Sequence, residues 1–216
     1  LKNWKSSLAD GEKASLGGFF EHARKLNLRN SVFVDITANS DVANIYPQYL
    51  KESISVVACN KIACSTDYDY YNELKDLSRK YNASFLFETN VGAGLPIITT
   101  LNDLRTSGDQ ILKIEGVFSG SLSFIFNNFD GSQKFSEIVT QAKELGYTEP
   151  DPRIDLSGKD VARKLLILAR ELDLENEFED VQIQNLIPEN LREGSAADFL
   201  GRISELNEQY QKIRKR

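Results

Sequence analysis

Histidine, cysteine and methionine are scarce in this sequence of 216 residues, which contains one histidine, two cysteines and no methionine. Cys59 and Cys64 have a spacing that fits neither a CxxC redox pair nor a zinc knuckle. His22 alone cannot complete a zinc site, and thiol or histidine-triad chemistry has too few residues as well. The lack of methionine also leads us to expect a fragment of a longer protein.

An excess of basic residues and long apolar runs are also missing. The formal net charge is -6 and the pI is near 5.0, which gives no basic field for nucleic acid or an anionic membrane surface. No stretch approaches the roughly 20 apolar residues of a membrane span, and residues 1–10 lack a signal-peptide pattern. We therefore expect a cytoplasmic protein whose partners are small molecules and other protein chains.

What the sequence does contain is an alternation of helix and strand patterns, with enough apolar residues, 41%, for a sizeable core. Apolar residues at helical spacing alternate with short β-branched and aromatic runs. The expected helices are Leu16–Asn27, Val42–Leu50 and Tyr68–Tyr81. The expected strands are Ser31–Thr37, Ile54–Ala58 and Ser84–Phe87. This order predicts an α/β fold with a parallel, doubly wound sheet.

The pattern changes after Pro96, so we expect a domain junction near Leu95 and two domains, residues 1–94 and 95–216. Residues 111–118, ILKIEGVF, predict a strand. The remaining segments predict helices at Leu95–Arg105, Leu122–Asn128, Phe135–Leu145 and Gly158–Leu172, and one exposed helix at 196–216.

Two of the expected strands are followed by polar residues that suit a ligand site. Thr37 follows the first strand and Lys61 follows the second. Ligands of doubly wound sheets bind at the carboxyl ends of the strands, so both side chains are candidates for the cofactor crevice. The alternatives are that residues 37–40 only turn the chain and cap the next helix, and that Lys61 is an ordinary solvated lysine.

Two segments of small residues suit charged ligands. Residues 87–96, FETNVGAGLP, combine glycines with a carboxylate, and carbonyl and carboxylate oxygens are the ligands of a hard cation. A hinge between two domains is the other interpretation. Residues 119–123, SGSLS, offer backbone amides to a substrate carboxylate, or else form an ordinary turn.

The most specific pattern is GYTEPDPRIDLSGKDVARKL at residues 146–165. Its two prolines predict an extended loop before a helix. Asp160 and Lys164 share one helix face, and a partly desolvated lysine beside a carboxylate can transfer a proton, with Glu149 nearby. The alternative is structural, with Ser157 and Asp160 in a capping box and an ordinary Asp160–Lys164 pair. The expected core stripe of this helix is Val161, Leu165, Leu168 and Leu172.

Three segments together resemble the signature stretches of homoserine dehydrogenases, in the same order and at suitable separations. They are FETNVGAGLPII at 87–98, GVFSGSLSFIF at 116–126 and GYTEPDPRIDLSGKDVARKLLILARE at 146–171. The resemblance is clear from about Trp4 to Arg170 and is closest to dehydrogenases fused behind an aspartate kinase. Enzymes of this family interconvert aspartate 4-semialdehyde and homoserine with NADPH or NADH, on the route to threonine and methionine.

The resemblance implies roles for ten residues. Lys164 matches the proton donor and acceptor at the reacting oxygen, and Glu149 and Asp160 match carboxylates that hold the substrate. The positions that match cofactor contacts, for NADP or NAD, are Thr37, Lys61 and Gly146. The positions that match ligands of a structural sodium ion are Glu88 and, through backbone carbonyls, Val91, Ala93 and Leu95.

The family architecture implies a partial Rossmann-like nucleotide-binding domain, then an α/β catalytic and dimerisation domain. We therefore expect a homodimer or larger homo-oligomer, and a fused aspartate kinase is a further possibility. One alternative function is that of a different semialdehyde or imine reductase with the same domain plan. The presence of Glu149, Asp160 and Lys164 argues against it, since another substrate should alter these residues. The alternative from another class is a non-catalytic dimerisation or assembly module.

The sequence departs from the family at several places. Cys59 and Ile62 stand where the family has a proline and a second lysine, which puts the choice between NAD and NADP in doubt. Ile154 replaces the first of two aspartates, a change that we expect to be tolerated. The Gly-x-Gly loop that opens a nucleotide-binding domain is not found before Trp4. We therefore do not expect this fragment alone to be sufficient for catalysis.

Overall fold

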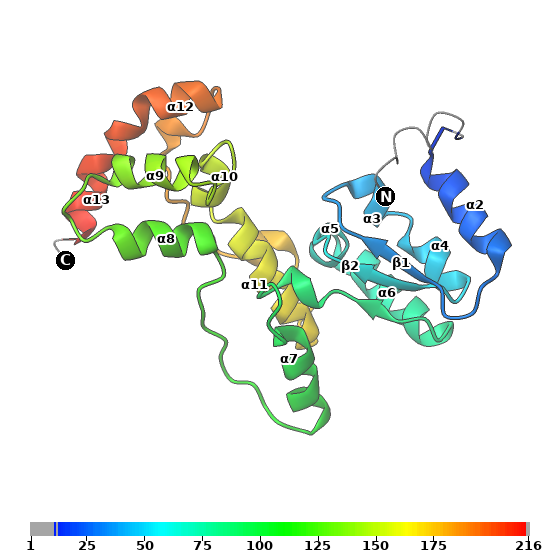
Figure 1. Ribbon diagram of the computed structural model, residues 1–216. Coiled ribbons are helices and arrows are strands. Elements are labelled where there is room, and N and C mark those ends of the chain that lie inside the picture. Colours follow the sequence, from blue (N-terminus) through cyan, green and yellow to red (C-terminus); the bar gives the residue numbers. More distant parts are fainter. Residues whose placement is uncertain (1–10, 12, 215–216) are drawn as a thin grey trace. The chain divides into compact units, whose positions relative to one another are not determined.

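The structure is a computed structural model that describes residues 11 and 13–214. The chain divides into two compact units at Asn90–Val91, a few residues before the junction expected near Leu95 (Figure 1). Unit 1 contains a parallel sheet, which confirms the α/β fold class expected from the sequence.

The sheet of unit 1 has three parallel strands in the order β1-β2-β3. They are β1 (Val32–Asp35), β2 (Ser55–Ala58) and β3 (Phe85–Leu86). Val34 of β1 pairs with Val57 of β2, which pairs with Leu86 of β3. All three expected strands are confirmed, each shorter than its apolar run. The carboxyl ends of the strands therefore lie along one edge, as the sequence predicts.

The helices of unit 1 include α4 (Tyr46–Lys51) and α6 (Tyr68–Lys80), which pack against each other and the sheet. Tyr49 of α4 is fully buried and its ring stacks on Phe33 with centroids 4.1 Å apart. The others are α2 (Leu16–Leu26), α3 (Ser40–Ala43), α5 (Ile62–Ser65) and the short 3-10 helix η1 (Glu88–Asn90). The faces of α4 and α6 that meet the sheet thus form an aromatic and aliphatic core.

The single helix expected at Val42–Leu50 is wrong, because the segment forms two helices. The first, α3, ends at Ala43 and the second, α4, begins at Tyr46. Pro47 lies in the first turn of α4, the one part of a helix that tolerates a residue without a backbone N–H. A proline at this position begins a new helix more readily than it continues an old one.

The core of unit 1 contains a buried carboxylate, that of Asp35, the last residue of β1, whose exposed fraction is 1%. One carboxylate oxygen accepts a hydrogen bond from the backbone N–H of Thr37 at 2.7 Å. The other accepts from the Tyr46 hydroxyl at 2.5 Å and from the Asn60 amide at 3.0 Å. Burial raises the pKa of the Asp35 carboxyl, but these donors together hold it below its usual value.

Among its described residues, unit 2 has helices as its only regular secondary structure. Its long helices are α7 (Ile97–Thr106), α8 (Gly120–Asn128), α9 (Phe135–Glu144) and α11 (Lys159–Glu171). The other helical segments are α10 (Arg153–Leu156), α12 (Ala196–Arg202), α13 (Leu206–Arg214) and the 3-10 turns η2 (Phe178–Asp180), η3 (Glu189–Leu191) and η4 (Ile203–Glu205). Its core gathers around Phe135, which stacks on Tyr210 with ring centroids 3.6 Å apart. Among the helices described in either unit, none has the length and apolar character to span a membrane.

The strand predicted at 111–118 and the single exposed helix predicted at 196–216 are both wrong. Residues 111–118 form no regular secondary structure, and Leu112 and Val117 are 92% and 78% exposed. A β pattern makes a strand only where a neighbouring strand accepts its backbone hydrogen bonds. The helix expected at 196–216 is divided into α12, η4 and α13 and is not simply exposed, because Phe199, Ile203, Leu206 and Tyr210 are buried in the core. Residues 215–216 lie outside the described range.

The helix α11 has a different buried face and a different first residue from those expected. Its buried apolar residues are Ala162, Leu166, Ile167 and Leu168, whereas Leu165 is 40% exposed. The N-cap is Gly158, with φ of +75°, and not Ser157, which the capping-box alternative named. A side chain at Gly158 would be strained by this φ and would place a Cβ 3.2 Å from Ile183. Only Leu168 of the expected core stripe is thus fully buried.

The Asp35 carboxylate should make the stability of the protein depend on pH in acid. Because its folded-state pKa is lowered, it stabilises the fold fully above its unfolded pKa, and this contribution is lost as pH falls through the folded pKa. Between about pH 6 and about pH 3, Asp35→Asn should therefore lose less unfolding free energy than the wild type, measured by urea denaturation. At neutral pH the variant should be less stable by about 1–3 kcal/mol. Parallel pH profiles for the two proteins would contradict this role of Asp35.

Candidate active site

The residues after β1 form a turn that presents Thr37 to solvent. The Thr37 N–H is held by Asp35, and its hydroxyl oxygen accepts a hydrogen bond from the Asn39 N–H at 3.2 Å. Asn39 in turn caps α3, since its side-chain oxygen accepts from the Asp41 N–H at 2.7 Å. The capping alternative considered for residues 37–40 is therefore correct for Asn39, while Thr37 stays exposed at the strand end.

Lys61 follows the end of β2 by three residues and is the N-cap residue of α5. Its carbonyl accepts hydrogen bonds from the Cys64 N–H at 3.1 Å and the Ser65 hydroxyl at 2.8 Å, which fixes its backbone. Asn60, directly before it, donates to Asp35 and to the Asn39 carbonyl, both at 3.0 Å. The loop that carries Thr37 and the loop that carries Lys61 are thus joined to each other by Asn60.

The sodium candidates occupy the segment on both sides of Asn90. Glu88 begins η1 in unit 1, while Val91, Ala93 and Leu95 open unit 2. Within unit 2, Ala93 has φ of +53°, an uncommon value for a residue with a side chain. The Leu95 N–H donates to the Gly92 carbonyl at 3.0 Å, and the Leu95 carbonyl accepts from the Ile97 N–H at 2.9 Å. The loop therefore has a tight, defined path.

In unit 2 the structure brings Asp160 and Lys164 together. The Lys164 ammonium lies 2.8 Å from an Asp160 carboxylate oxygen and donates to the Phe118 carbonyl, also at 2.8 Å. The Lys164 side chain is 19% exposed. An ordinary surface pair would leave both side chains in water, whereas this lysine is also tied to backbone from a distant segment. In the described part of the chain, those two acceptors occupy two of the three N–H donors of the ammonium group.

Glu149 is positioned through its backbone by Asp155. The Glu149 N–H donates to one Asp155 oxygen at 2.9 Å, and the Ser121 hydroxyl lies 2.7 Å from the other. Ser121 also lies 2.6 Å from the Tyr147 carbonyl. The loop 147–149 is thereby attached to the first turn of α8, and the Glu149 side chain is exposed. Sequence reasoning assigned no role to Asp155 or Ser121, although both lie inside the segments that carry the family resemblance.

Two other segments expected to bind ligands have clear local structure. Ser119 is the N-cap of α8, and its hydroxyl oxygen accepts from the Leu122 N–H at 3.1 Å. This hydrogen bond fits the ordinary turn that was the alternative to carboxylate binding by residues 119–123. Gly146 lies in the turn after α9, where its N–H donates to the Lys143 carbonyl at 3.0 Å. Gly146 belongs to unit 2, unlike Thr37 and Lys61.

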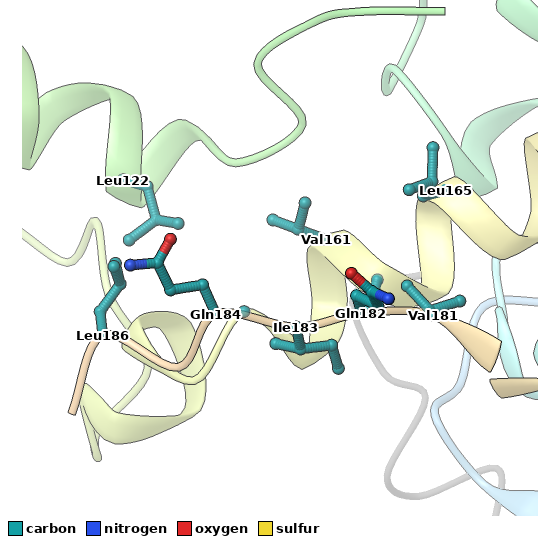
Figure 2. Close-up of a pocket in the computed structure, with 10 residues that line it drawn as sticks. Leu122, Val161, Leu165, Val181, Gln182, Ile183, Gln184 and Leu186 are labelled. Atoms are coloured by element: carbon teal, nitrogen blue, oxygen red, sulfur yellow. The ribbon is translucent and has the colours of Figure 1, made fainter. Parts of the chain in front are cut away.

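A pocket of about 270 Å³ lies along α11 (Figure 2). Val161 and Leu165 project into it from α11, and Figure 2 shows Gln182 and Gln184 on the extended segment that lines another side. Val161 and Leu165 each follow a member of the Asp160–Lys164 pair by one position on the helix. Val161 and Leu165 are less buried than the expected core stripe would require because they line an open pocket instead of packing in the core.

Together these features suit a small polar substrate. Lys164 can hold or deliver a proton at an oxygen atom, because one donor of its ammonium group is not used by Phe118 or Asp160. Asp160 and Glu149 can receive an amino group. In unit 1 the exposed Thr37 and the half-buried Lys61 provide a hydroxyl and a cation at the carboxyl ends of β1 and β2, where nucleotides bind in sheets of this kind.

Comparison with protein families gives two matches that cover nearly the whole chain. Residues 2–88 match the family described as homoserine dehydrogenase, NAD binding domain, and residues 96–215 match the homoserine dehydrogenase family. The interval between the two matches contains the boundary between the units at Asn90–Val91. The segment with the sodium candidates thus extends across that boundary.

Individual relatives agree with these matches. The bifunctional aspartokinase/homoserine dehydrogenase 1 of Arabidopsis thaliana, a chloroplastic protein, is 46% identical over 217 residues, which are 99% of this chain and 24% of that protein. A homoserine dehydrogenase of Paracoccidioides brasiliensis is 44% identical over 194 residues, which are 85% of this chain and 52% of that protein. The chain therefore spans about a quarter of the first relative and about half of the second.

Solved structures show the same likeness. A protein of unknown function from Candida auris has a TM-score of 0.89 and 37% identity, over 99% of this chain and 61% of its own. A hyperthermophilic archaeal homoserine dehydrogenase in complex with NADPH has a TM-score of 0.63 and 31% identity, over 77% of this chain and 50% of its own. One family match covers more than half of the chain and the other covers most of the rest, which confirms the resemblance drawn from the three sequence segments. The chain belongs to the homoserine dehydrogenase family.

Proposed function

We propose that this chain carries the substrate site and part of the cofactor site of an NAD(P)-dependent homoserine dehydrogenase. The enzyme would interconvert L-homoserine and L-aspartate 4-semialdehyde in threonine and methionine biosynthesis. The observation that carries the proposal is Lys164, a mostly buried ammonium group held by Asp160 and by the Phe118 carbonyl. A lysine held in this way can keep its position at the reacting oxygen, which a flexible surface lysine cannot.

Lys164 is the proposed proton donor and acceptor. During reduction, negative charge develops on the aldehyde oxygen, and an adjacent ammonium stabilises that charge and delivers a proton to the oxygen. In the reverse direction the same amine takes the proton from the homoserine hydroxyl. Asp160 keeps the ammonium aligned at 2.8 Å, and the Phe118 carbonyl prevents it from turning toward solvent.

Glu149 and Asp160 are the proposed anchors for the substrate, with Glu149 binding its amino group. Support for Glu149 comes from its loop, which Asp155 and Ser121 attach to α8, while its carboxylate remains exposed. A fixed backbone with an available carboxylate favours a charge-assisted hydrogen bond to an ammonium group. Asp160 would serve both the substrate and Lys164.

Thr37, Lys61 and Gly146 are the proposed contacts to the cofactor. When it is bound, the nicotinamide supplies or accepts the hydride. The residues of unit 1 fit this role because Thr37 and Lys61 follow adjacent parallel strands. The loops that carry them, residues 37–39 and 59–62, contain no acidic side chain that would repel a phosphate. Lys61 without a second lysine at Ile62 leaves both NADP and NAD as candidates.

The sodium ion is a further proposal, drawn from the family resemblance. Its ligands would be the Glu88 carboxylate and the carbonyls of Val91, Ala93 and Leu95. The chemistry of the donor set fits, because oxygen ligands suit a hard cation, and the tight path of residues 92–97 gives the carbonyls fixed directions. Assembly as a homodimer or larger oligomer, and fusion to an aspartate kinase like that of the Arabidopsis relative, stay predictions.

Lys164→Ala should lower kcat for homoserine oxidation by about a hundredfold or more, a typical loss for a general acid or base. The assay follows nicotinamide absorbance in the intact protein that carries this chain. Lys159→Ala is the matched control, because Lys159 lies in the first turn of the same helix and its side chain is exposed. An equal loss in both variants would contradict the role of Lys164, and an inactive wild-type protein would favour a non-catalytic module.

Glu149→Gln should raise the KM for homoserine by about tenfold, the equivalent of one weakened charge-assisted contact, with little change in the KM for the cofactor. The expected reason is that the amide binds an ammonium group less strongly than a carboxylate does. Steady-state kinetics with each substrate varied in turn would measure both constants. Glu144→Gln, an exposed residue at the end of α9, provides the control. Equal changes in the two KM values would show that Glu149 does not select the amino acid substrate.

A further inference from the structure

The proposed function gives no role to the buried polar group at the carboxyl end of β1. Asp35, Tyr46 and Asn60 have exposed fractions of 1%, 0% and 2%, respectively, and none of the three was a candidate site residue from sequence. We propose that these three residues form a latch that holds the loops 37–39 and 60–62 in the conformation that binds the nicotinamide cofactor. The proposal rests on the cofactor site proposed above, with Thr37 and Lys61 as its contacts in unit 1.

The hydrogen bonds of the latch converge on both loops. One Asp35 oxygen holds the Thr37 N–H, while the other holds the Asn60 side chain. Asn60 then bonds the first loop through the Asn39 carbonyl at 3.0 Å and its own loop through the Ile62 N–H at 3.1 Å. The backbone on both sides of Lys61 and at Thr37 is therefore fixed by a single carboxylate.

The Tyr46 hydroxyl is the part of the latch that comes from outside the two loops. It donates to the same Asp35 oxygen as Asn60 does, and α4 holds it from the core of unit 1. With two donors on this oxygen and one on the other, the carboxylate has one orientation that satisfies all three partners. Asn60 is thereby held in the rotamer that reaches Asn39.

A comparison within α4 separates this role from general core packing. Tyr49 is as buried as Tyr46, and its hydroxyl has no hydrogen-bond partner among the described residues. Its contribution is its ring, which stacks on Phe33. Of these two buried tyrosines on one short helix, only Tyr46 donates its hydroxyl to Asp35.

The physical consequence concerns binding more than chemistry. A site that is already ordered before the ligand arrives loses little conformational entropy on binding. If the latch is opened, the loops must be ordered by the cofactor itself, and its affinity falls. The latch residues belong to unit 1, whereas the proposed proton-transfer and substrate residues belong to unit 2, so the KM for homoserine and the kcat at saturating cofactor should change little.

The test compares Tyr46→Phe with Tyr49→Phe in the intact protein that carries this chain. The affinity for NADPH is measured by titrating nicotinamide fluorescence, and the KM values of cofactor and homoserine are measured separately. Tyr46→Phe should weaken NADPH binding and raise the cofactor KM by about tenfold, the effect of losing one hydrogen bond to a charged group. Tyr49→Phe makes the same chemical change on the same helix and should leave both values unaltered.

Asp35→Asn supplies a second variant for the same measurements. Its amide group presents N–H donors to partners that are themselves donors, either Thr37 or the pair Tyr46 and Asn60, so the loss of NADPH affinity should exceed that of Tyr46→Phe. Thermal unfolding of each variant identifies loss of structure. A Tyr46→Phe protein with raised KM values for both substrates and a lowered Tm would overturn the latch, because that result describes a merely structural residue.

Lys61→Ala distinguishes failure of the latch from failure of the cofactor site. If Lys61→Ala weakens NADPH binding while Tyr46→Phe and Asp35→Asn do not, the cofactor site stands and the latch is wrong. If none of the three substitutions weakens binding, the proposed cofactor site is wrong and the latch fails with it. Weaker binding in all three, with an unaltered Tyr49→Phe control, supports both.

Discussion

A charge that leaves water must be compensated by hydrogen bonds or an opposite charge, and the local order of both units depends on this constraint. Asp35 meets it with donors from the loop after β1, from α4 and from the loop after β2. Lys164 meets it with Asp160 and the Phe118 carbonyl. The fully buried side chain of Arg170 meets it with the Asn176 carbonyl and the Glu177 carboxylate. Asp35 and Lys164 thereby connect segments that follow different elements or are distant in the sequence, whereas Arg170 fixes the loop that follows its own helix.

This constraint also explains why candidate functional residues lie where they do. Strand ends and helix starts carry backbone groups that the regular hydrogen-bond ladder leaves unpaired, and side chains such as Asn39, Asn60 and Ser119 satisfy them. Once these backbone groups are satisfied internally, an exposed neighbour such as Glu149 can meet a ligand without its side chain having to maintain the fold. Structural polar residues and ligand-binding residues therefore alternate along the same short loops.

The sequence predicted those features that depend on local pattern. The strands were identified because β-branched runs such as ISVVA have a single strong preference, and α6 and α9 because their apolar spacing is regular. The helix pair Asp160 and Lys164 was found from spacing alone, since the geometry of a helix fixes it. Recognition of the family required more than pattern, because the roles of Glu149 and Gly146 came from resemblance and from no physical property of those residues.

What the sequence could not supply depends on contacts between distant segments. Residues 111–118 have a strand pattern and no strand in the described structure, because a strand exists only through its neighbour. Val161 and Leu165 have core spacing but line a pocket, because the face that a helix buries is decided by what packs against it. The same limit hid Asp35: an aspartate at the end of an apolar run is equally compatible with a solvated strand end and with a buried acceptor. Only the presence of Tyr46 and Asn60 beside it decides between the two, and neither residue can be identified as a partner until the fold has brought it there.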